Sequence, residues 1–583
     1  MTPDAWFTDH PPSERWPHYT RANAGEVLPT PASPLGQTFA FDSGILPGFQ
    51  EGSTKTGFYE LSEYRDRPPE MCGFFGGYFY INLANVRMQA VRNPAITIEQ
   101  LDTAFFGDHP DVPPYTPHPE DDKPHLQPIA DQHMNFVMTA TEWPELLEDK
   151  RQVAELRAER PELSGLSDQQ LVDRATMILP MLVALGSRHL IASSSSGIAP
   201  GMLAAVADAV DDPTLPMRLL ASLGDVDSAA PSYEMWDMSR TIRSSEVLTA
   251  AFDEGVEGLV GRLAGSDSDD ARSFLQTFVG FLAEYGSRGP NEWELSAQTW
   301  ETDPTICLAA IERIRFQDDG EAPKLRAARL KEERERLVDE VGEKLAALGD
   351  EALTGMFHGA LVGGNMMIFR ERGKTNVIKA LHEVRMAFRE LGSRHADSGN
   401  LSQPSHIFQL TVDEVQAFID APKDWSSTLA ERAFHWEELW DLEPPFFIKD
   451  GKVPPLADWA RKGKTVSSAL SPGESIAGVA GSPGVVEGTA RIVMDPSDPG
   501  DLGPGDIMVA PLTDPAWTPL FMAADGVVVN VGGQISHAII VSRELGLPCV
   551  VSATDATTKI PDGATIGIDG SSGEVTLVSL PDA

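Results

Sequence analysis

The sequence predicts a multidomain α+β protein in which a large, mainly α-helical domain is followed by a small α/β domain. Apolar residues recur at helical spacing in the charged segment 323–348 and again over 375–391, which predicts two amphipathic helices. Near the C-terminus, the Val-rich run 526–531 is followed by two glycines and another helical pattern. This order is typical of a buried strand, a sharp turn and a helix.

Length and composition restrict the class of protein. With 583 residues the chain has room for two to four domains. Its 46 basic and 87 acidic residues give a formal net charge of -41, which disfavours a nucleic-acid or anionic-membrane surface. The cysteines, Cys72, Cys307 and Cys549, offer neither a metal-binding spacing nor a disulfide framework. We therefore expect a cytoplasmic protein without a metal site of its own.

The sequence contains no predicted membrane segment. Its N-terminus lacks the basic stretch and apolar core of a signal peptide. Residues 190–207 come nearest to a membrane span, but their serines, glycines and proline favour a helix-loop-helix connection.

Composition also indicates the domain boundaries. Residues 1–141 mix short apolar runs with many prolines and glycines, which predicts loops, a few strands and short helices. Residues 142–463 follow helical patterns and form the predicted helical domain. The small polar residues of 464–475, broken by proline and glycine, predict a hinge linker before the α/β domain at 476–583.

His537 is the candidate reactive residue. Ser536 is suited to an N-cap, the run to Leu545 has helical spacing, and Gly546 supplies a stop. His537 would then lie in the first turn of a helix, where unpaired N–H groups and the helix dipole favour a phosphoryl group. A neutral imidazole can attack phosphorus and later release the phosphoryl group. The alternative is a capping or buried structural histidine.

The segment 532–548, GGQISHAIIVSRELGLP, resembles the phosphohistidine signature of the swivelling domain in phosphoenolpyruvate-utilising enzymes. Segments 481–493, 505–521 and 562–578 resemble the rest of that domain in the same order. The resemblance implies that His537 carries a phosphoryl group and that its domain swivels between a loading and an unloading site. Asn530 stands where many relatives have an acidic residue, which changes local contacts.

Segments 20–35, 74–83, 284–304 and 370–392 resemble the substrate-binding part of rifampicin phosphotransferase and of two-subunit phenol-phosphorylating enzymes such as phenylphosphate synthase. This resemblance implies phosphate or substrate contacts for Arg288, Arg370 and Lys374. A helix would place Arg370 and Lys374 on one side, where they would stabilise a phosphoryl group in transit. The alternatives are a solvated basic turn for this pair and a loop-structural role for Arg288.

Nothing in the sequence resembles the ATP-grasp module that loads the histidine in this family, or the barrel that binds pyruvate. The resemblance therefore implies an acceptor-binding and phosphohistidine subunit of a two-component dikinase. A separate ATP-grasp partner would hold ATP and Mg²⁺, producing AMP and phosphate, while the hydroxyl of a phenol or other apolar alcohol is phosphorylated. The alternatives are a noncatalytic phosphocarrier or regulatory protein, a component of a rifampicin-type antibiotic phosphotransferase, and an enzyme loaded directly from phosphoenolpyruvate.

We expect two further features to have structural and not catalytic roles. Arg243-Ser244-Ser245 is similar to a nucleotide-binding motif, but its helical surroundings predict a helix boundary. His358 has methionine and phenylalanine neighbours and could serve as a base, but we interpret it as a core residue.

Overall fold

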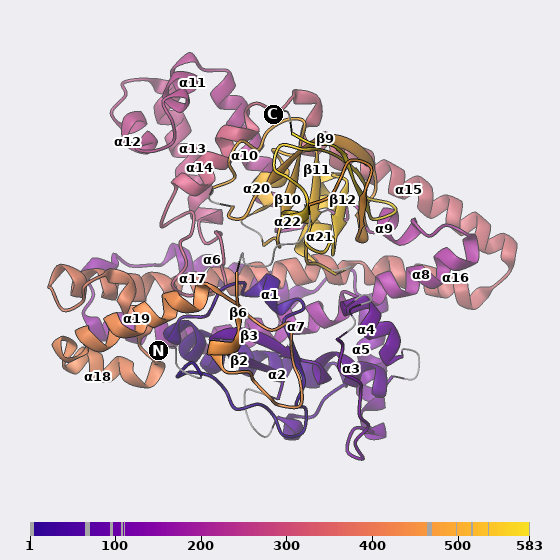
Figure 1. Cartoon of the computed structure of the whole chain (residues 1–583), viewed down its shortest axis with the longest axis horizontal. Helices are drawn as coiled ribbons and strands as arrows, with labels where there is room; N and C mark the ends of the chain where they lie inside the picture. Colours follow the sequence, from indigo (N-terminus) through magenta and orange to yellow (C-terminus); the bar gives the residue numbers. More distant parts are fainter. Residues whose placement is uncertain are drawn as a thin grey trace. The chain divides into compact units, whose positions relative to one another are not determined.

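The structure is a computed structural model that describes residues 5–64, 70–93, 97–106, 109, 111–224, 226–462, 469–496, 498–514, 517–533 and 536–581. It is 56% helical, with a large helical region and a small α/β domain at the C-terminal end of the chain (Figure 1). The predicted fold class is thus confirmed.

The chain forms two compact units, and neither unit is continuous in sequence. The first comprises 1–195, 293–297 and 372–465, and the second comprises 196–292, 298–371 and 466–583. Helix α17 (Asn365–Asp397) continues from the second unit into the first. The predicted hinge at 464–475 lies partly outside the described residues, so its role stays a prediction.

The first unit contains a four-stranded sheet of order β2-β3-β1-β5. Its central strand pairs residues far apart in the chain, because Tyr19 lies opposite Asn82 on one side and Ile448 on the other. The strands of this unit are β1 (Tyr19–Thr20), β2 (Cys72–Phe75), β3 (Tyr78–Asn82), β5 (Phe447–Ile448) and the separate pair β4 (Leu442–Glu443) and β6 (Ala460–Arg461).

Helices form most of the first unit, and two of them approach closely. A Cβ atom added to Gly48 or Gly52 of α2 would lie 2.3 or 2.4 Å from the carbonyl oxygens of Val183 or Ser187 in α7. Glycine is therefore required at this contact. The helices are α1 (Ala24–Val27), the π-helix η1 (Gly36–Ile45), α2 (Leu46–Lys55), η2 (Leu61–Glu63), α3 (Ala84–Val91), α4 (Ile98–Phe106), η3 (Pro124–Leu126), α5 (Gln127–Thr139), α6 (Pro144–Ala158), η4 (Leu163–Gly165), α7 (Asp168–Ser195), most of α17, η6 (Pro404–Gln409), η7 (Val412–Glu414), α18 (Val415–Asp420), η8 (Pro422–Trp425), α19 (Ser426–Trp440) and η9 (Leu456–Asp458).

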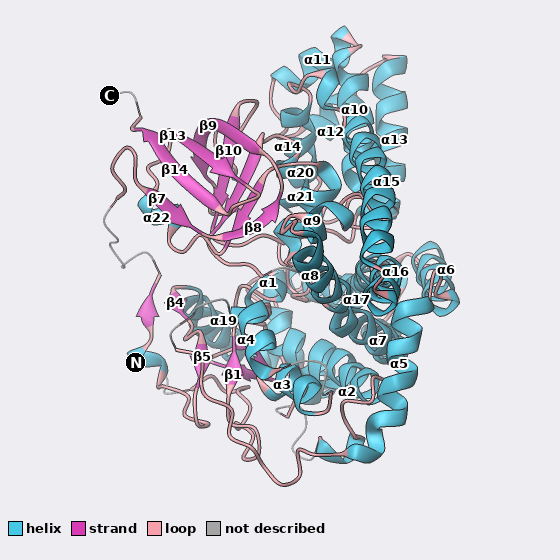
Figure 2. Cartoon of the chain, turned by 90° about the vertical axis from the view of Figure 1, so that its right-hand side faces the viewer, coloured by secondary structure: helices cyan, strands magenta, loops and turns pink. Residues whose placement is uncertain are grey.

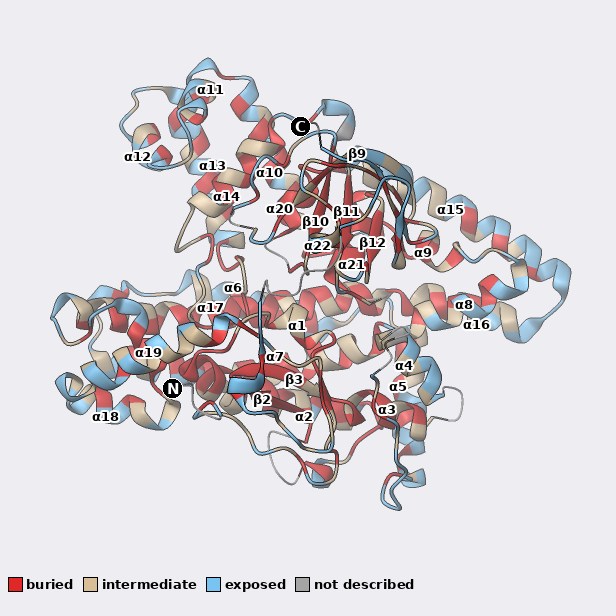
Figure 3. Cartoon of the chain, in the orientation of Figure 1, coloured by how far each residue is buried: buried red, intermediate tan, exposed pale blue. Residues whose placement is uncertain are grey.

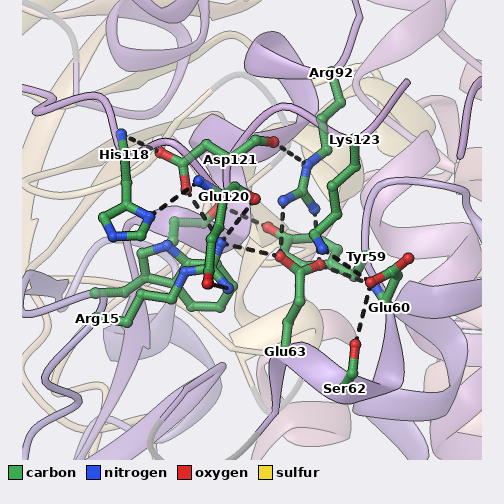
Figure 4. A network of polar contacts seen from close by, with 12 residues as sticks. Arg15, Tyr59, Glu60, Ser62, Glu63, Arg92, His118, Glu120, Asp121 and Lys123 are labelled. Carbon is green, nitrogen blue, oxygen red and sulfur yellow. Dashed lines mark hydrogen bonds and ion pairs between the residues drawn. The ribbon is translucent and has the colours of Figure 1, made fainter. Parts of the chain in front are cut away.

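A buried network of ion pairs ties the N-terminal segments of this unit together (Figure 4). Arg92 donates two hydrogen bonds to Glu63, at 2.7 and 2.9 Å, and both side chains are almost fully buried. Arg15 lies 3.3 Å from Asp121 and from Glu63. Each buried charge is therefore paired, as low-polarity surroundings require.

Among the described residues of the second unit, nine helices form a region that we call the helical arm. The predicted helix 323–348 is confirmed as α15, whereas the helix predicted at 375–391 is part of the longer α17. The helices of the arm are α8 (Ile198–Val210), α9 (Leu215–Leu219), α10 (Ala230–Arg243), α11 (Glu246–Asp253), α12 (Leu259–Ala264), α13 (Asp269–Tyr285), α14 (Thr305–Ile314), α15 (Pro323–Leu348) and α16 (Glu351–Gly363), with the short turn η5 (Asp319–Glu321).

The α/β part of the second unit, which we call the histidine domain, is built on an eight-stranded sheet (Figure 2). Its order is β7-β14-β13-β9-β10-β11-β12-β8, and β9 to β12 run parallel. Strands β10, β11 and β12 are buried throughout (Figure 3), which explains their apolar sequences. The elements are β7 (Ser475–Ala477), β8 (Val479–Ser482), β9 (Val485–Ile492), β10 (Asp506–Ala510), α20 (Thr518–Phe521), β11 (Gly526–Val529), α21 (His537–Leu545), β12 (Cys549–Val551), α22 (Ala556–Lys559), β13 (Thr565–Asp569) and β14 (Glu574–Ser579).

The arm and the histidine domain share one apolar core. Met235, Phe278 and Ile311 of the arm belong to the same buried cluster as Trp517 and Phe521 of the histidine domain. Burial of aromatic and aliphatic surface on this scale stabilises the contact between the two regions.

Within the part of the chain that the structure describes, two helical stretches, Asp168–Val210 and Glu351–Asp397, are long and apolar enough to cross a membrane by length and composition. Within them, 50% and 44% of the most apolar window is buried inside the protein. The first stretch is two helices, α7 and α8, which confirms the helix-loop-helix prediction for 190–207. Core helices of soluble proteins pass the same test, so these stretches are weak evidence for a membrane span.

Candidate active site

His537 begins helix α21, as the sequence predicts. Ser536 has the extended backbone of an N-cap, with φ -66° and ψ 158°, and Gly546 ends the helix in the left-handed region at φ 68°. Ser536 does not cap through its side chain. An added Cβ at Gly532 would lie 3.0 Å from the Ser536 hydroxyl, so a glycine fits the turn before the helix.

The His537 ring is held between two threonines. Thr513 Oγ1 lies 3.1 Å from Nδ1, and Thr518 Oγ1 lies 3.1 Å from Nε2. The edge of the ring meets Phe521 in a T-shaped contact with centroids 5.9 Å apart. His537 is only 7% exposed, so its ring is fixed in orientation by hydroxyl groups and an aromatic wall.

The topology of the sheet brings these residues together. Strands β10 and β11 are parallel neighbours. The segment after β10 carries Thr513 and Thr518, and the segment after β11 leads to His537. Ligands of open α/β sheets bind beyond the carboxyl ends of parallel strands, and the site lies at that edge.

The pair of hydroxyl contacts suits a neutral imidazole. Such a ring has one N–H donor and one acceptor nitrogen, and a hydroxyl can satisfy either. The acceptor nitrogen has the lone pair that a nucleophile needs, and its threonine must release that lone pair before the nitrogen attacks phosphorus, while the opposite hydrogen bond fixes the tautomer.

Arg288 lies in a loop that contacts the segment carrying Thr513. It is 3% exposed and lies 3.1 Å from Glu292 Oε1, so it forms a buried ion pair. In the same loop, the backbone N–H of Asn291 donates to Asp514 Oδ2 at 3.0 Å. The loop is thus linked to the residue beside Thr513, which in turn contacts His537.

Arg370 and Lys374 lie four residues apart on helix α17. Arg370 is partly buried, with its Nε 3.9 Å from Glu371 Oε1, and Lys374 is also partly buried. The boundary between the two units falls between Glu371 and Arg372. The phosphate-contacting roles of Arg370 and Lys374, like that of Arg288, stay predictions.

The side-chain amide of Asn530 makes two hydrogen bonds to one residue. Its amide nitrogen donates to Thr557 Oγ1 at 2.7 Å, and its amide oxygen accepts from Thr557 N–H at 3.0 Å. An amide can make both contacts, whereas an ionised carboxylate can only accept. Asn530 therefore ties the end of β11 to α22.

Two further sequence interpretations have different outcomes. Ser244 follows α10, and Ser245 caps α11 by accepting from Leu248 N–H, so the predicted helix boundary is confirmed. The prediction that His358 is a core residue is wrong, because it lies on the exposed side of α16. The preceding residue, Phe357, is buried instead. The apolar neighbours of His358 therefore belong to the packed side of α16, and His358 lies on the other side.

Among the described residues, no group of three or more His, Cys, Asp or Glu side chains could hold a metal ion. Cys72, Cys307 and Cys549 are buried free thiols. Burial raises the pKa of the Cys549 thiol to about 12 and that of the other two still further, which keeps all three protonated and poorly nucleophilic.

Two family models match the chain. The rifampicin phosphotransferase fourth domain matches residues 189–369, which include the helical arm, and the mobile domain of PEP-utilising enzymes matches residues 502–573. The second match contains His537 with Thr513 and Thr518. Residues 502–573 are therefore similar to the mobile domain of the PEP-utilising enzymes.

Curated relatives agree with this family. Rifampicin phosphotransferase of Streptomyces sviceus is 30% identical over 54% of this chain and 37% of the relative. The uncharacterized phosphotransferase YvkC of Bacillus subtilis is 29% identical over 59% of this chain and 41% of the relative. The prodigiosin synthesizing transferase PigC of Serratia marcescens is 27% identical over 62% of this chain and 40% of the relative. The chain spans about two fifths of the length of these relatives.

Sequence reasoning did not single out Thr513 and Thr518. They lie 24 and 19 residues before His537, and only the pairing of β10 with β11 brings them to the ring. The one available signal was the resemblance of segment 505–521 to the family, which marked the segment without identifying its threonines as ring contacts.

Proposed function

We propose that this chain carries a phosphoryl group on His537 and passes it to the hydroxyl group of a small acceptor. The observation that supports this proposal is the imidazole in the first turn of α21. It is held between Thr513 and Thr518, within the segment that matches the mobile domain. Relatives named as phosphotransferases support the same type of group transfer.

In the loading step, the lone pair of one imidazole nitrogen forms a bond to phosphorus as the bond to the donor's leaving group breaks. In the second step, an acceptor oxygen forms the new bond to phosphorus, the P–N bond breaks, and the hydroxyl proton leaves to a base. The threonine on the opposite nitrogen fixes the ring throughout, and the first-turn N–H groups of α21 favour the phosphoryl oxygens. ATP, bound together with Mg²⁺ on a separate ATP-grasp partner, would supply the phosphoryl group and give AMP and phosphate.

The acceptor class within this proposal is a phenol or another apolar alcohol, bound by the helical part of the chain. Arg370 and Lys374 would stabilise the phosphoryl group in transit, because a guanidinium and an ammonium one helical turn apart can contact different oxygens. The buried pairing of Arg288 with Glu292 supports a different role, in which Arg288 positions the loop beside Thr513.

The test is labelling of the full chain by its ATP-grasp partner with magnesium and labelled ATP. The label should be acid-labile and base-stable, and His537→Ala should abolish it. His358→Ala is the matched control, since that histidine is exposed on α16, and it should label normally. Full labelling of His537→Ala would refute the carrier role. A chain that labels but never discharges to a hydroxyl compound would favour the noncatalytic phosphocarrier.

A second prediction separates loading from transfer. Arg370→Ala and Lys374→Ala should still accumulate phosphohistidine but discharge it about a hundred- to a thousandfold more slowly, as is typical for loss of one charge-stabilising contact. Arg370→Lys should stay impaired, because an ammonium cannot reproduce the planar guanidinium. The measurement is a single-turnover chase of preloaded protein with a phenol.

Lys344→Ala, at an exposed position of α15, provides the control for loss of a positive charge. Discharge at the unmutated rate in both Arg370→Ala and Lys374→Ala would remove these residues from the transfer site.

A further inference from the structure

The segment that follows β12 lies at the same edge of the sheet as the active site. The segments after β10 and β11 carry the two threonines and the histidine, and β12 is the other parallel neighbour of β11. After β12, the backbone N–H of Ala553 donates to the carbonyl of Val529 at 3.0 Å, and Thr557 binds the side chain of Asn530. The segment 552–557 therefore holds the end of β11, from which the chain continues to the histidine.

Ser552, the first residue of this segment, holds the turn that precedes His537. Its hydroxyl donates to the carbonyl of Gly532 at 2.6 Å. The next residue, Gly533, accepts from Ser536 N–H at 2.9 Å, which closes the turn, and His537 follows as the first residue of α21. The hydrogen bond from Ser552 thus fixes the turn from which the imidazole projects.

Gly532 is also closely packed on its other sides. An added Cβ would lie 3.1 Å from Val551 Cβ and 3.0 Å from the Ser536 hydroxyl. The preceding residue, Val531, donates from its backbone N–H to the carbonyl of Pro511 at 3.2 Å. Because the packing around Gly532 leaves little free space, a change in its position also moves the start of α21.

The backbone of Ser552 is strained. Its φ of 53° lies in the left-handed region that favours glycine. A glycine would relieve this strain, but it could not donate to the Gly532 carbonyl. A non-glycine residue keeps such a conformation only where the surrounding structure holds it, and such positions concentrate at functional sites. The strained backbone and the hydroxyl contact therefore indicate the same role.

We propose that Ser552 is a positioning residue for His537. Its hydroxyl holds the Gly532 carbonyl, and the turn then places the imidazole between its two threonines. Ser552 acts through the turn and not by contact with the phosphoryl group. The orientation of the ring stands on these hydrogen bonds alone, whereas the effect of Ser552 on phosphoryl transfer rests on the proposed function.

Two variants of the full chain separate positioning from stability. Ser552→Ala removes the hydroxyl and keeps the strain, so its midpoint of denaturant unfolding should fall. Ser552→Gly also removes the hydroxyl but relieves the strain, which offsets the lost bond, so its midpoint should stay close to that of the unmutated chain. Both variants should label His537 about threefold to tenfold more slowly, as expected for loss of one hydrogen bond. A purely structural role would leave Ser552→Gly labelling at the full rate.

Ser552→Thr should give the reverse combination. It restores the hydroxyl, but a β-branched side chain at this φ increases the strain, so the midpoint should fall while labelling stays close to the unmutated rate. Asp555→Gly is the matched control, because Asp555 also has a positive φ, 62°, and its carboxylate lies 3.5 Å from Lys559 Nζ. It should label at the unmutated rate.

Nitrogen NMR of His537 in the unphosphorylated chain measures the orientation of the ring directly. The balance of the two neutral tautomers should shift in Ser552→Ala and Ser552→Gly, because the ring is no longer held between its two hydroxyl groups, and it should be unchanged in Asp555→Gly. An unchanged balance in both Ser552 variants, or labelling that follows stability, would overturn the proposal. If His537 accepts no phosphate from ATP in any chain, the proposed function fails, and the NMR result still decides the role of Ser552.

Discussion

At the scale of single residues, Thr513 and Thr518 fix the orientation of the His537 imidazole. Both ring nitrogens have a hydroxyl 3.1 Å away, so rotation of the ring would break two hydrogen bonds. Each is worth about 0.5 to 1.5 kcal/mol. The ring is therefore held in place before any phosphoryl group arrives.

Thr513→Val and Thr518→Val should each slow labelling of His537 about threefold to tenfold, since each removes one hydrogen bond with little change in volume. Thr→Ser at the same positions should restore most of the rate, because the hydroxyl returns. Nitrogen NMR of His537 provides an independent readout, as the balance of its two neutral tautomers should shift in opposite directions in the two valine variants. An unchanged tautomer balance in both would show that the threonines do not orient the ring.

At the scale of elements, glycines in helices have opposite roles in the two units. Gly52 of α2 lies against the backbone of α7, where an added Cβ would be 2.4 Å from an oxygen atom. Gly342 of α15 has nothing within 4 Å of such a Cβ. Helix propensity alone predicts that replacing glycine by alanine stabilises the helix at both positions. The expected difference between Gly52 and Gly342 therefore comes from packing.

Gly52→Ala should destabilise the first unit by about 1 to 3 kcal/mol or more, because α2 must move away from α7. Gly342→Ala should instead stabilise the second unit by about 0.5 to 1 kcal/mol, because alanine is the better helix former and meets no neighbour. Denaturant unfolding of the two variants checks the opposite signs. Equal effects in the same direction would contradict the packing argument.

Local sequence patterns predicted the elements that have their own start and stop signals. Helix α21 has Ser536 before it and Gly546 after it, and α15 begins at Pro323. Helix α17 begins before the predicted segment 375–391 and runs through Gly373, a poor helix former whose added Cβ would lie 3.1 Å from His189 Cα. Thr513 and Glu544 gain their roles from residues distant in the chain, so local periodicity carried no signal for them.

At the scale of the whole molecule, Glu544 makes the stability of the second unit depend on pH. Burial raises the pKa of Glu544 from its ordinary value of 4.5 to about 7, so the protonated carboxyl is favoured where it accepts from Leu223 N–H. This contribution is fully present below pH 4.5 and is lost as the pH rises through about 7. Arg334 and Tyr233 are the other ionisable groups that interact with it.

The folded second unit should therefore lose up to about 3 kcal/mol of stability between pH 4.5 and pH 8, because the pKa of Glu544 is about 7 when buried and 4.5 when exposed. Glu544→Gln should remove this part of the pH dependence, since its amide does not titrate. Hydrogen exchange at Leu223 N–H, corrected for the intrinsic effect of pH, provides the measurement. An identical pH dependence in Glu544→Gln would show that another group is responsible.

The pairing of Tyr19 with Ile448 has a consequence for synthesis on the ribosome. The strand β1 emerges early, but its partner β5 lies more than 400 residues later in the chain. At a translation rate of about 5 to 20 residues per second, one edge of the nascent sheet stays unpaired for roughly 20 to 90 seconds. Throughout that interval the edge of β1 can recruit strands from other nascent chains. We therefore expect synthesis of this chain to depend on chaperones that cover the waiting edge, and slower translation to increase that dependence.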